Sequence, residues 1–383
     1  MARALYIHWP FCEKKCPYCD FNSHVRATVD VAAWRTALIA DMRAEQAAAG
    51  EQRLSSIFFG GGTPSLMDPA LVADLLHDAE RLWGFADDIE ITLEANPSSV
   101  EAGNFSALAA SGINRVSLGL QALDDETLRW LGRLHSSKDA LNALEIAQNC
   151  FDRVSFDLIY ALPGQRPEQW EKQLSQALSY GTSHLSLYQL TIEPGTRFAS
   201  DVRRGVFEPL EDDAAADLFA LTQELTAAHG LPAYETSNHS SAGHASKHNL
   251  TYWRYEDYCG IGPGAHGRRT GMATIRHKKP ENYLKAVQTR GHGISEQRTL
   301  SAHEQATEAI LMGLRLVEGT DLSRAASRFG LTPQHLLDWD KFDQYQEHGF
   351  VWRHQDRIGL TEAGRPLLNA LLGELIADEL VAT

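Results

Sequence analysis

Short apolar runs alternate with amphipathic stretches along the first half of the chain. Trp34, Leu38 and Met42, for example, share one face of a helix that Asp30 would begin and Gly50 would end. The predicted helices span residues 30–50, 68–83, 100–110, 124–131, 137–149 and 167–180. The predicted strands span residues 5–7, 54–59, 89–94, 115–118, 154–160 and 184–190. This alternation predicts a parallel sheet with right-handed crossovers, and six repeats are too few for a closed eight-stranded barrel. We therefore expect an α/β fold built on a partial (β/α)6 barrel.

The second half of the chain follows a different pattern. A helix is predicted over 212–229, and the stretch 234–267, rich in His, Asn, Gly and aromatic residues, predicts no regular element. Further predicted elements are helices over 321–329, 333–346 and 361–378 and a hairpin formed by 350–352 and 357–360. This order resembles a winged-helix module, so we expect a smaller, mostly helical, winged-helix-like C-terminal domain. Its helices are not notably basic, which favours a docking or lid role over DNA binding. The predicted units are a barrel over 1–230, a connecting region over 231–300 and a C-terminal domain over 301–383.

Composition and charge narrow the class of protein. The 383 residues carry a net charge of −15, which argues against a general nucleic-acid binder. No apolar run is long enough to span a bilayer, and the N-terminus shows no signal-peptide pattern. Five cysteines, three of them close together, do not form a disulfide framework. We therefore expect a cytoplasmic protein in a reducing compartment.

The clustered cysteines are Cys12, Cys16 and Cys19, in the pattern C-x3-C-x2-C directly after the first predicted strand. Three thiolates on one loop can hold three irons of a cubane cluster and leave the fourth iron open to another ligand. Structural zinc is the alternative, and His8 or His24 would have to supply its fourth ligand.

Other polar and glycine-rich residues also follow predicted strands. The segment 60–64, GGGTP, follows the second strand, and Glu94 and Asp157 lie in later strands near their ends. Ligands bind at this edge in parallel α/β folds. The glycines lack the Gly-Lys-Ser/Thr of a phosphate loop, and a plain turn is the alternative. For each carboxylate the alternative is a capped or ion-paired strand end.

The cysteine pattern, with Tyr18 before its last cysteine, resembles the radical S-adenosylmethionine superfamily. That resemblance implies a [4Fe-4S] cluster on Cys12, Cys16 and Cys19 and S-adenosylmethionine on its open iron. The segments YIHWPFCEKKCPYCDF, FFGGGTPS, LEANP, NRVSLGLQ and DLIYALPGQ further resemble the HemN family of coproporphyrinogen III dehydrogenases and the related HemW group of haem chaperones. The resemblance implies that S-adenosylmethionine is contacted by Tyr6, Gly61, Gly62, Thr63, Glu94, Gln121, Arg133 and Asp157.

Two features separate the groups within this family. The dehydrogenases carry C-x3-C-x2-C-x-C and an extension before the first strand, whereas this chain has Phe21 at the last cysteine position and no such extension. Residues 248–253, HNLTYW, match HNxxYW, the haem-binding signature of the chaperone group. The resemblance thus implies haem contacts by His248, Asn249, Tyr252 and Trp253, with His248 the favoured axial ligand. A histidine and two aromatic residues packed in a domain junction are the alternative. For the glycine-rich segment 260–267, an approach to the cofactor and a structural turn cluster both stay open.

We therefore expect a haem chaperone that delivers haem to apo haem proteins of the respiratory chain at the inner face of the membrane. By the same resemblance we expect a homodimer, no nucleic-acid partner and no coproporphyrinogen III dehydrogenase activity. The alternatives are an oxygen-independent coproporphyrinogen III dehydrogenase and a radical methyltransferase or cyclase acting on another tetrapyrrole.

Overall fold

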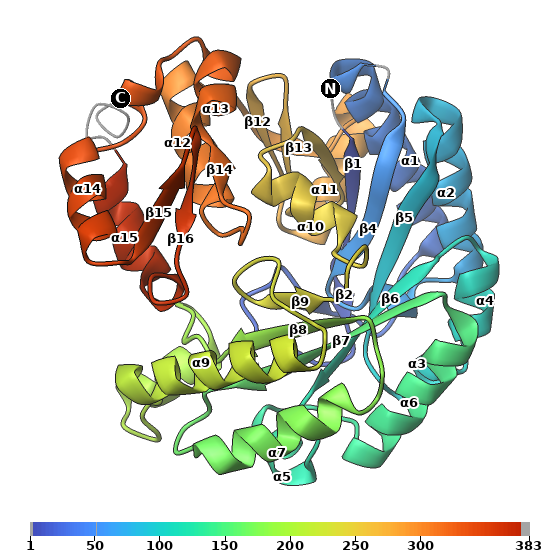
Figure 1. The fold of residues 1–383 in the computed structure, drawn as a ribbon. Coiled ribbons are helices and arrows are strands. Elements are labelled where there is room, and N and C mark those ends of the chain that lie inside the picture. The colour runs from blue at the N-terminus through green and yellow to red at the C-terminus, as the bar shows by residue number, and fades with distance from the viewer. Residues whose placement is uncertain (1–2, 51, 377–383) are drawn as a thin grey trace.

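A sheet of 11 strands organises the computed structural model, which describes residues 3–50 and 52–376 (Figure 1). Within these residues the strand order is β13-β12-β11-β10-β1-β4-β5-β6-β7-β8-β9. The bounds are β1 Ala4–Trp9, β4 Leu54–Gly61, β5 Phe85–Ala95, β6 Arg115–Gln121, β7 Arg153–Tyr160, β8 His184–Gln189, β9 Asn238–Ser240, β10 Tyr258–Ile261, β11 His266–Arg269, β12 Met272–Arg276 and β13 Ile294–Thr299. The six predicted strands are β1, β4, β5, β6, β7 and β8.

These six strands are parallel and lie side by side in chain order. A parallel sheet that never reverses its strand order curves into an arc of a barrel, as in the larger closed (β/α)8 fold. The predicted fold class, a partial barrel with a winged-helix-like C-terminal domain, is therefore confirmed. The carboxyl ends of all six strands meet at one edge of the arc, where the candidate site lies.

The helices of this part of the chain correspond to the predicted ones, with the exception of α8, which was not predicted. Their bounds are α1 Val31–Ala49, α2 Pro69–Trp83, α3 Ser99–Ala102, α4 Phe105–Ala110, α5 Asp125–Trp130, α6 Ser137–Cys150, α7 Pro167–Leu178, α8 Arg197–Arg203 and α9 Asp212–Ala228. Asp30 caps α1 as predicted, because its side chain accepts a hydrogen bond from the backbone N–H of Ala33. The single helix predicted over 100–110 is wrong: α3 ends before Gly103 and α4 begins after Asn104, a pair that favours a turn over helix.

The stretch 234–267, for which no element was predicted, extends the barrel. It contains β9, α10 Lys247–Trp253 and β10. Strand β10 runs parallel to β1 on the side opposite β4, with Leu5 opposite Cys259. Strands β11, β12 and β13 continue from β10 in antiparallel order, and α11 Pro280–Arg290 connects the last two. The stretch was missed because its strands, β9 and β10, are only 3 and 4 residues long, too short to show an alternating pattern.

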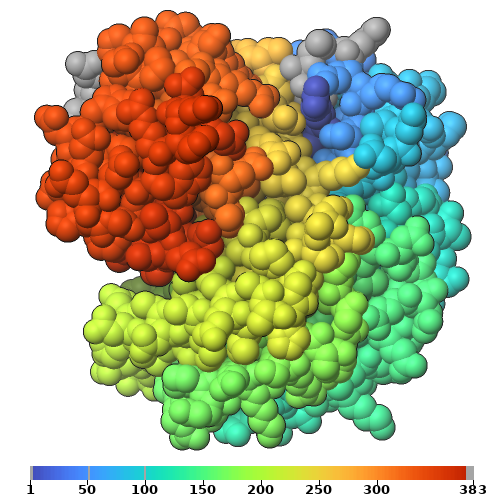
Figure 2. Space-filling model, viewed as in Figure 1, coloured from blue at the N-terminus to red at the C-terminus, as the bar shows by residue number. Residues whose placement is uncertain are grey.

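The C-terminal residues form a second lobe with its own hydrophobic core. Its buried side chains run from Ala306 to Ile376 and include Phe342 and Ile358. The elements are α12 Ala302–Gly313, β14 Thr320–Asp321, α13 Leu322–Phe329, η2 Pro333–His335, α14 Trp339–Glu347, β15 Val351–His354, β16 Arg357–Leu360, η3 Arg365–Leu367 and α15 Leu368–Leu375. Figure 2 shows the orange and red lobe set apart by a notch from the yellow-green residues below it. The predicted domain boundaries at 230 and 300 stay a prediction.

Three predictions in this lobe need correction. Strand β14 pairs with β16 and adds a third strand to the predicted hairpin. The helix predicted over 333–346 is interrupted, because Asp338 caps a new helix by accepting from the N–H of Lys341. The last helix begins at Leu368 rather than Thr361, whose hydroxyl accepts from the N–H of Gly364 in a turn. The predicted end of that helix at residue 378 lies outside the described residues.

None of the helices in the described residues combines the length and apolar character needed to cross a membrane.

Candidate functional site

The cysteine loop is held at both ends by a short parallel strand pair. Cys12 ends β2 (Phe11–Cys12), which pairs with β3 (His24–Val25). Inside the loop the N–H of Cys19 donates to the carbonyl of Cys16 over 3.2 Å, forming a tight turn. All three predicted cluster cysteines line a cavity of about 490 Å³ at the carboxyl ends of the barrel strands. We call it the smaller cavity, and its volume suits a nucleoside-sized ligand.

Donors from the loops after β4 and α5 reach two of these sulfurs. The hydroxyl of Thr63 donates to Cys12 Sγ over 3.5 Å, and Arg133 Nη1 donates to Cys16 Sγ over 3.6 Å. Burial raises the pKa of the Cys12 thiol, and the hydrogen bond from Thr63 opposes that shift. Hydrogen bonds and a nearby cation stabilise thiolates, which are the form that binds iron.

The cysteines are not arranged around a single ion. Among the described residues no three His, Cys, Asp or Glu side chains are gathered closely enough to hold one metal ion. Structural zinc requires four ligands converging on one point, whereas a [4Fe-4S] cluster holds each thiolate on a separate iron. His8 and His24, the residues that zinc would need, are hydrogen-bonded instead around Asn22. The geometry therefore favours the cluster.

The glycine-rich segment at the end of β4 packs closely against the backbone and side chains at the end of β1 and in β2. Gly61 has φ +114°, and a Cβ there would lie 2.5 Å from the ring of His8. A Cβ on Gly62 would lie 2.6 Å from the carbonyl oxygen of Phe11. The N–H of Gly62 in turn donates to the carbonyl of Trp9 over 2.7 Å. Only glycine fits these two positions, and their backbone forms one wall of the smaller cavity.

Two carboxylates line the same cavity from neighbouring parts of the sheet. Glu94, on β5, accepts from the N–H of Gly61 over 3.2 Å, and Asp157, on β7, accepts from the hydroxyl of Ser117 over 3.4 Å. Burial raises the pKa of Glu94 to about 8, with a further contribution from the charge of Asp157. Burial likewise raises the pKa of Asp157 to about 6, opposed by a hydrogen bond from Ser186. Such carboxylates are stabilised by an ammonium group or by hydroxyl donors of a ligand.

Arg133 connects the cysteine loop to the sheet. Its Nη2 donates to Asn96 Oδ1 over 2.6 Å and to the carbonyl of Gly119 over 2.8 Å. Its Nε is buried without a hydrogen-bond partner among the described residues. Asn96 also donates to the hydroxyl of Thr63 over 3.1 Å. Sequence reasoning missed Asn96, although it lies two residues after Glu94 in the LEANP segment.

Gln121 ends β6 in a left-handed conformation, with φ 71°, and lines the smaller cavity. The pairing of β6 with β7 shifts register just before it, between Leu118 and Gln121. A non-glycine residue in this conformation is uncommon, and its place on the cavity wall makes Gln121 a candidate functional residue. Tyr6, by contrast, lines a second cavity rather than this one, and its hydroxyl lies 3.0 Å from His8 Nδ1.

The second cavity, which we call the larger cavity, has a volume of about 720 Å³. Aromatic side chains from β1, α10 and β10 line it together with residues of the C-terminal lobe. Tyr252 and Trp253 of the HNxxYW segment are among them, and the Tyr252 and Tyr258 rings meet edge to face with centroids 4.4 Å apart. Residues that line both cavities are Lys15, Asp20, Phe21, Ser23, Gly61 and Glu94. Phe21 is 56% exposed at this shared wall.

His248 lies behind Tyr252 and is almost fully buried. Its Nε2 is 2.6 Å from the Tyr252 hydroxyl and its Nδ1 is 3.1 Å from the Ser56 hydroxyl. Its ring also stacks on Phe58 at 5.0 Å. Burial lowers the pKa of His248 to about 3, so the imidazole is neutral at physiological pH. Both ring nitrogens are therefore already engaged, and ligation of iron would require one of these bonds to break.

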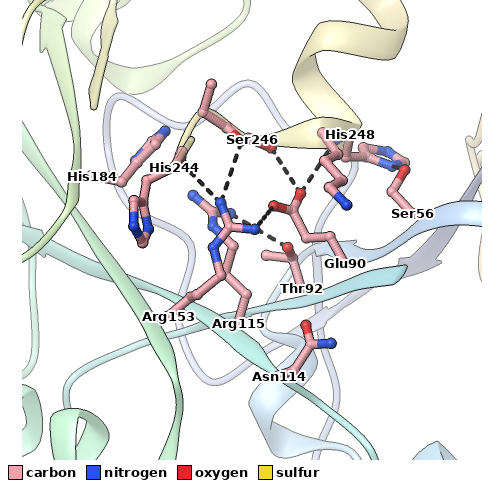
Figure 3. Close-up of polar contacts among 12 residues, drawn as sticks. Ser56, Glu90, Thr92, Asn114, Arg115, Arg153, His184, His244, Ser246 and His248 are labelled. Carbon is pink, nitrogen blue, oxygen red and sulfur yellow. Dashed lines mark hydrogen bonds and ion pairs between the residues drawn. The ribbon is translucent and has the colours of Figure 1, made fainter. Parts of the chain in front are cut away.

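A buried polar cluster fixes the start of α10 to the inside of the barrel (Figure 3). Glu90 forms an ion pair of 2.9 Å with Arg153 and accepts from the backbone N–H of His248 over 3.3 Å. Ser246, the cap of α10, donates to Glu90 and accepts from the backbone N–H of Asn249. These contacts orient α10 so that its last residues face the larger cavity while His248 and Asn249 lie at its anchored end. The predicted haem contacts of His248 and Asn249 stay a prediction.

Residues 6–176 match the radical SAM superfamily, and residues 300–367 match the HemN C-terminal domain. The chain is 36% identical to heme chaperone HemW of Escherichia coli, covering 98% of each chain. It is 38% identical to the mitochondrial radical S-adenosyl methionine domain-containing protein 1 of Bos taurus, over 98% of this chain and 87% of the relative. A solved structure of coproporphyrinogen III oxidase (HemN) from Escherichia coli matches with a TM-score of 0.79 at 21% identity, over 97% of this chain and 89% of that one. The last likeness concerns the fold.

Proposed function

The chain belongs to the family of the HemW haem chaperones within the radical SAM superfamily, and we propose that it binds haem and hands it to apo haem proteins. The superfamily's cofactors are a [4Fe-4S] cluster and S-adenosylmethionine. The single observation that carries the proposal is the larger cavity, an aromatic-lined space of about 720 Å³ that shares a wall with the candidate cofactor site. A porphyrin needs flat apolar faces around its ring, and this cavity provides them.

The smaller cavity fits the two cofactors. Cys12, Cys16 and Cys19 would hold three irons of the cluster, which supplies an electron and an open coordination site when bound. Thr63 and Arg133 would donate to two of the thiolates, as they do to the sulfurs in this structure. Charge-assisted hydrogen bonds of this kind tune the cluster and keep the loop in place.

The remaining residues of this cavity would hold S-adenosylmethionine. Gly61 and Gly62 allow its amino acid part to approach the backbone, and Glu94 offers a carboxylate to its ammonium group. Asp157 and Gln121 line the far side, where ribose hydroxyls can donate or accept. Tyr6 lies on the larger cavity beside Gly61, so we propose that it contacts the cofactor across the shared wall.

In the larger cavity we propose that Tyr252 and Trp253 pack against the porphyrin. The ring of Trp253 is held from the other side by the guanidinium of Arg315, which lies 4.6 Å from the ring centroid. The hydrogen bond between His248 Nε2 and the Tyr252 hydroxyl holds the Tyr252 ring in a fixed orientation on the cavity wall. The HNxxYW segment therefore contributes to the cavity chiefly through its last two residues.

Coproporphyrinogen III dehydrogenation is the second candidate function. The shared wall favours it, because a radical formed in the smaller cavity would face a tetrapyrrole in the larger one. Phe21 argues against it: the dehydrogenase pattern has a cysteine at this position, and here an exposed aromatic ring lies between the two cavities. We propose that the chain lacks dehydrogenase activity. We further propose that it delivers haem to apo haem proteins of the respiratory chain at the membrane and that it forms a homodimer.

One anaerobic experiment tests the proposal. After reconstitution of the cluster, haem is titrated into the chain, and coproporphyrinogen III turnover is assayed in parallel with S-adenosylmethionine and a reductant. We expect one haem per chain, no protoporphyrinogen, and transfer of the bound haem to an apo-cytochrome followed by its absorption bands. Protoporphyrinogen formation, or absence of haem binding, would contradict the chaperone function.

A further inference from the structure

Several side chains on the larger cavity belong to types that can ligate haem iron. The imidazoles are those of His8, His24 and His266, and the thioethers are those of Met272 and Met312. Four tyrosines also line the cavity, but burial raises the pKa of each phenol and so disfavours the phenolate that binds iron. His8 is buried and uses both ring nitrogens, one toward Tyr6 and one toward the carbonyl of Asn22. His24 is partly buried, and its Nε2 lies 3.3 Å from the side-chain oxygen of Asn22.

His266 differs from the other two. Its side chain is exposed on the wall of the larger cavity, and neither ring nitrogen has a hydrogen-bond partner in the described part of the chain, residues 3–50 and 52–376. Burial and the positive charges of Arg268 and Lys278 lower the pKa of His266, opposed by Glu296. The imidazole is thus largely neutral at physiological pH, which is the form that binds iron.

The backbone around His266 is rigid. His266 begins β11 and pairs with Ile275 of β12, and the N–H of Arg276 donates to the carbonyl of Ala265 over 2.9 Å. Gly260 lies so close that a Cβ there would collide with the backbone oxygen of His266 at 1.9 Å. A ligand carried on a paired strand is more precisely placed than one on a free loop. This also explains the glycine-rich segment 260–267: it allows β10 and β11 to approach closely and aims His266 at the cavity.

The charges beside His266 suit the propionates of haem. Arg268 is engaged by both carboxylate oxygens of Glu308, at 2.9 and 3.0 Å, and Arg328 is engaged by Asp257. Lys278 lines the same cavity, is exposed, and makes no ion pair with any of the described residues. Its ammonium group is therefore available to a carboxylate of the ligand.

We propose that His266 is the axial ligand of the haem iron in the larger cavity and that Lys278 binds a propionate; this assignment rests on the proposed haem binding. In this assignment His248 does not ligate the iron. Its ring instead holds Tyr252, which packs against the porphyrin, through their hydrogen bond. The assignment places the metal ligand in the glycine-rich segment rather than in the HNxxYW segment.

Anaerobic titration of ferric haem, followed by its Soret band and by electron paramagnetic resonance, tests the assignment in single variants of the full chain. We expect His266→Ala to lose at least about tenfold in affinity and to change the Soret position and spin state, with added imidazole restoring the spectrum. His248→Ala is expected to weaken binding while the spectrum stays that of the wild type. Lys278→Met is expected to weaken binding several-fold with an unchanged spectrum.

Two further variants serve as controls. His77→Ala, at an exposed position on α2, should bind haem as the wild type does, and His24→Ala should retain the wild-type spectrum. The assignment is overturned if His266→Ala keeps the wild-type spectrum and affinity, or if His24→Ala or His248→Ala loses the ligand signature instead. A wild-type chain that binds no haem would overturn the proposed function together with this assignment, whereas haem binding unchanged in His266→Ala would overturn the assignment alone.

Discussion

The two cavities share a wall but are built in different ways. The smaller cavity takes its polar residues from the cysteine loop after β1 and from the carboxyl-terminal parts of β4, β5, β6, β7 and β8, one after another along the chain. The larger cavity joins segments that are far apart: Tyr6 and Phe21 from the start, Tyr252 and His266 from the middle and Met312 from the C-terminal lobe. The first is an edge that any parallel barrel provides, and the second exists only because β10 returns to pair with β1. These separate origins are consistent with the two roles proposed above, a resident cofactor in the smaller cavity and haem in the larger one.

Removing a cluster thiolate gives the largest expected effect. In Cys16→Ser the loop keeps its turn but loses one iron ligand, so we expect the reconstituted protein to lack the brown absorbance and the iron and sulfide of a [4Fe-4S] cluster. Cys150→Ser, at the end of α6, is the matched control and should keep the absorbance, the iron and the sulfide of the cluster. A cluster that survives in Cys16→Ser would show that the ligands are assigned wrongly.

Replacing Arg133 should affect ligand binding in the smaller cavity and leave binding in the larger cavity nearly unchanged. In Arg133→Met the hydrogen bonds to Cys16 Sγ, Asn96 and the Gly119 carbonyl are lost, so we expect S-adenosylmethionine affinity to fall by about 1.5–3 kcal/mol, or roughly 10- to 150-fold. Haem affinity should change by less than about twofold, because Arg133 does not line the larger cavity. Isothermal titration of each ligand measures both values.

The matched control for this change is Arg129→Met on α5, an exposed arginine four residues earlier. It should bind both ligands as the wild type does. If Arg133→Met weakened haem as strongly as S-adenosylmethionine, the two cavities would not be independent.

Replacing His248 and replacing His266 should change the free energy of unfolding by different amounts. His248→Ala removes two side-chain hydrogen bonds and a buried ring, so we expect the free energy of unfolding to fall by about 2–4 kcal/mol. His266→Ala changes an exposed side chain and should cost less than about 0.5 kcal/mol. Urea unfolding of both variants without ligands makes the comparison, and equal losses would contradict the structural role of His248.

Protonation of His248 should make the free energy of unfolding depend on pH, which is a smaller effect than the loss of its side chain. Because burial lowers the pKa of His248 to about 3, the folded state keeps this imidazole neutral while the unfolded state, with a pKa of about 6.5, takes up a proton below that value. Stability from this group is therefore complete above about pH 6.5 and lost as the pH falls, by about 2 kcal/mol at pH 5. His248→Gln should flatten the change in unfolding free energy between pH 7 and pH 5 by that amount. An unchanged slope in the variant would show that His248 titrates normally.

The sequence predicts the smaller cavity better than the larger one, for the same structural reason. Glu94 and Asp157 lie in strands, and Cys12 lies shortly after a strand, that the strand–helix alternation predicts. Their meeting at one edge therefore follows from the parallel topology. Strand β10 and the position of His266 depend on a pairing across more than 250 residues with β1, which local patterns do not encode. The HNxxYW segment shows a third case, because the sequence indicated the residues but not that His248 would be held by Ser56 and Tyr252.

Whether the two cavities hold their ligands together is tested by titrating S-adenosylmethionine into the reconstituted chain with and without one equivalent of haem. We expect one S-adenosylmethionine per chain in both titrations and dissociation constants within about threefold of each other, since the proposed contacts of the two ligands lie on different residues. Loss of S-adenosylmethionine binding in the haem-loaded chain, with haem released by excess S-adenosylmethionine, would show that both occupy one site and would contradict this account.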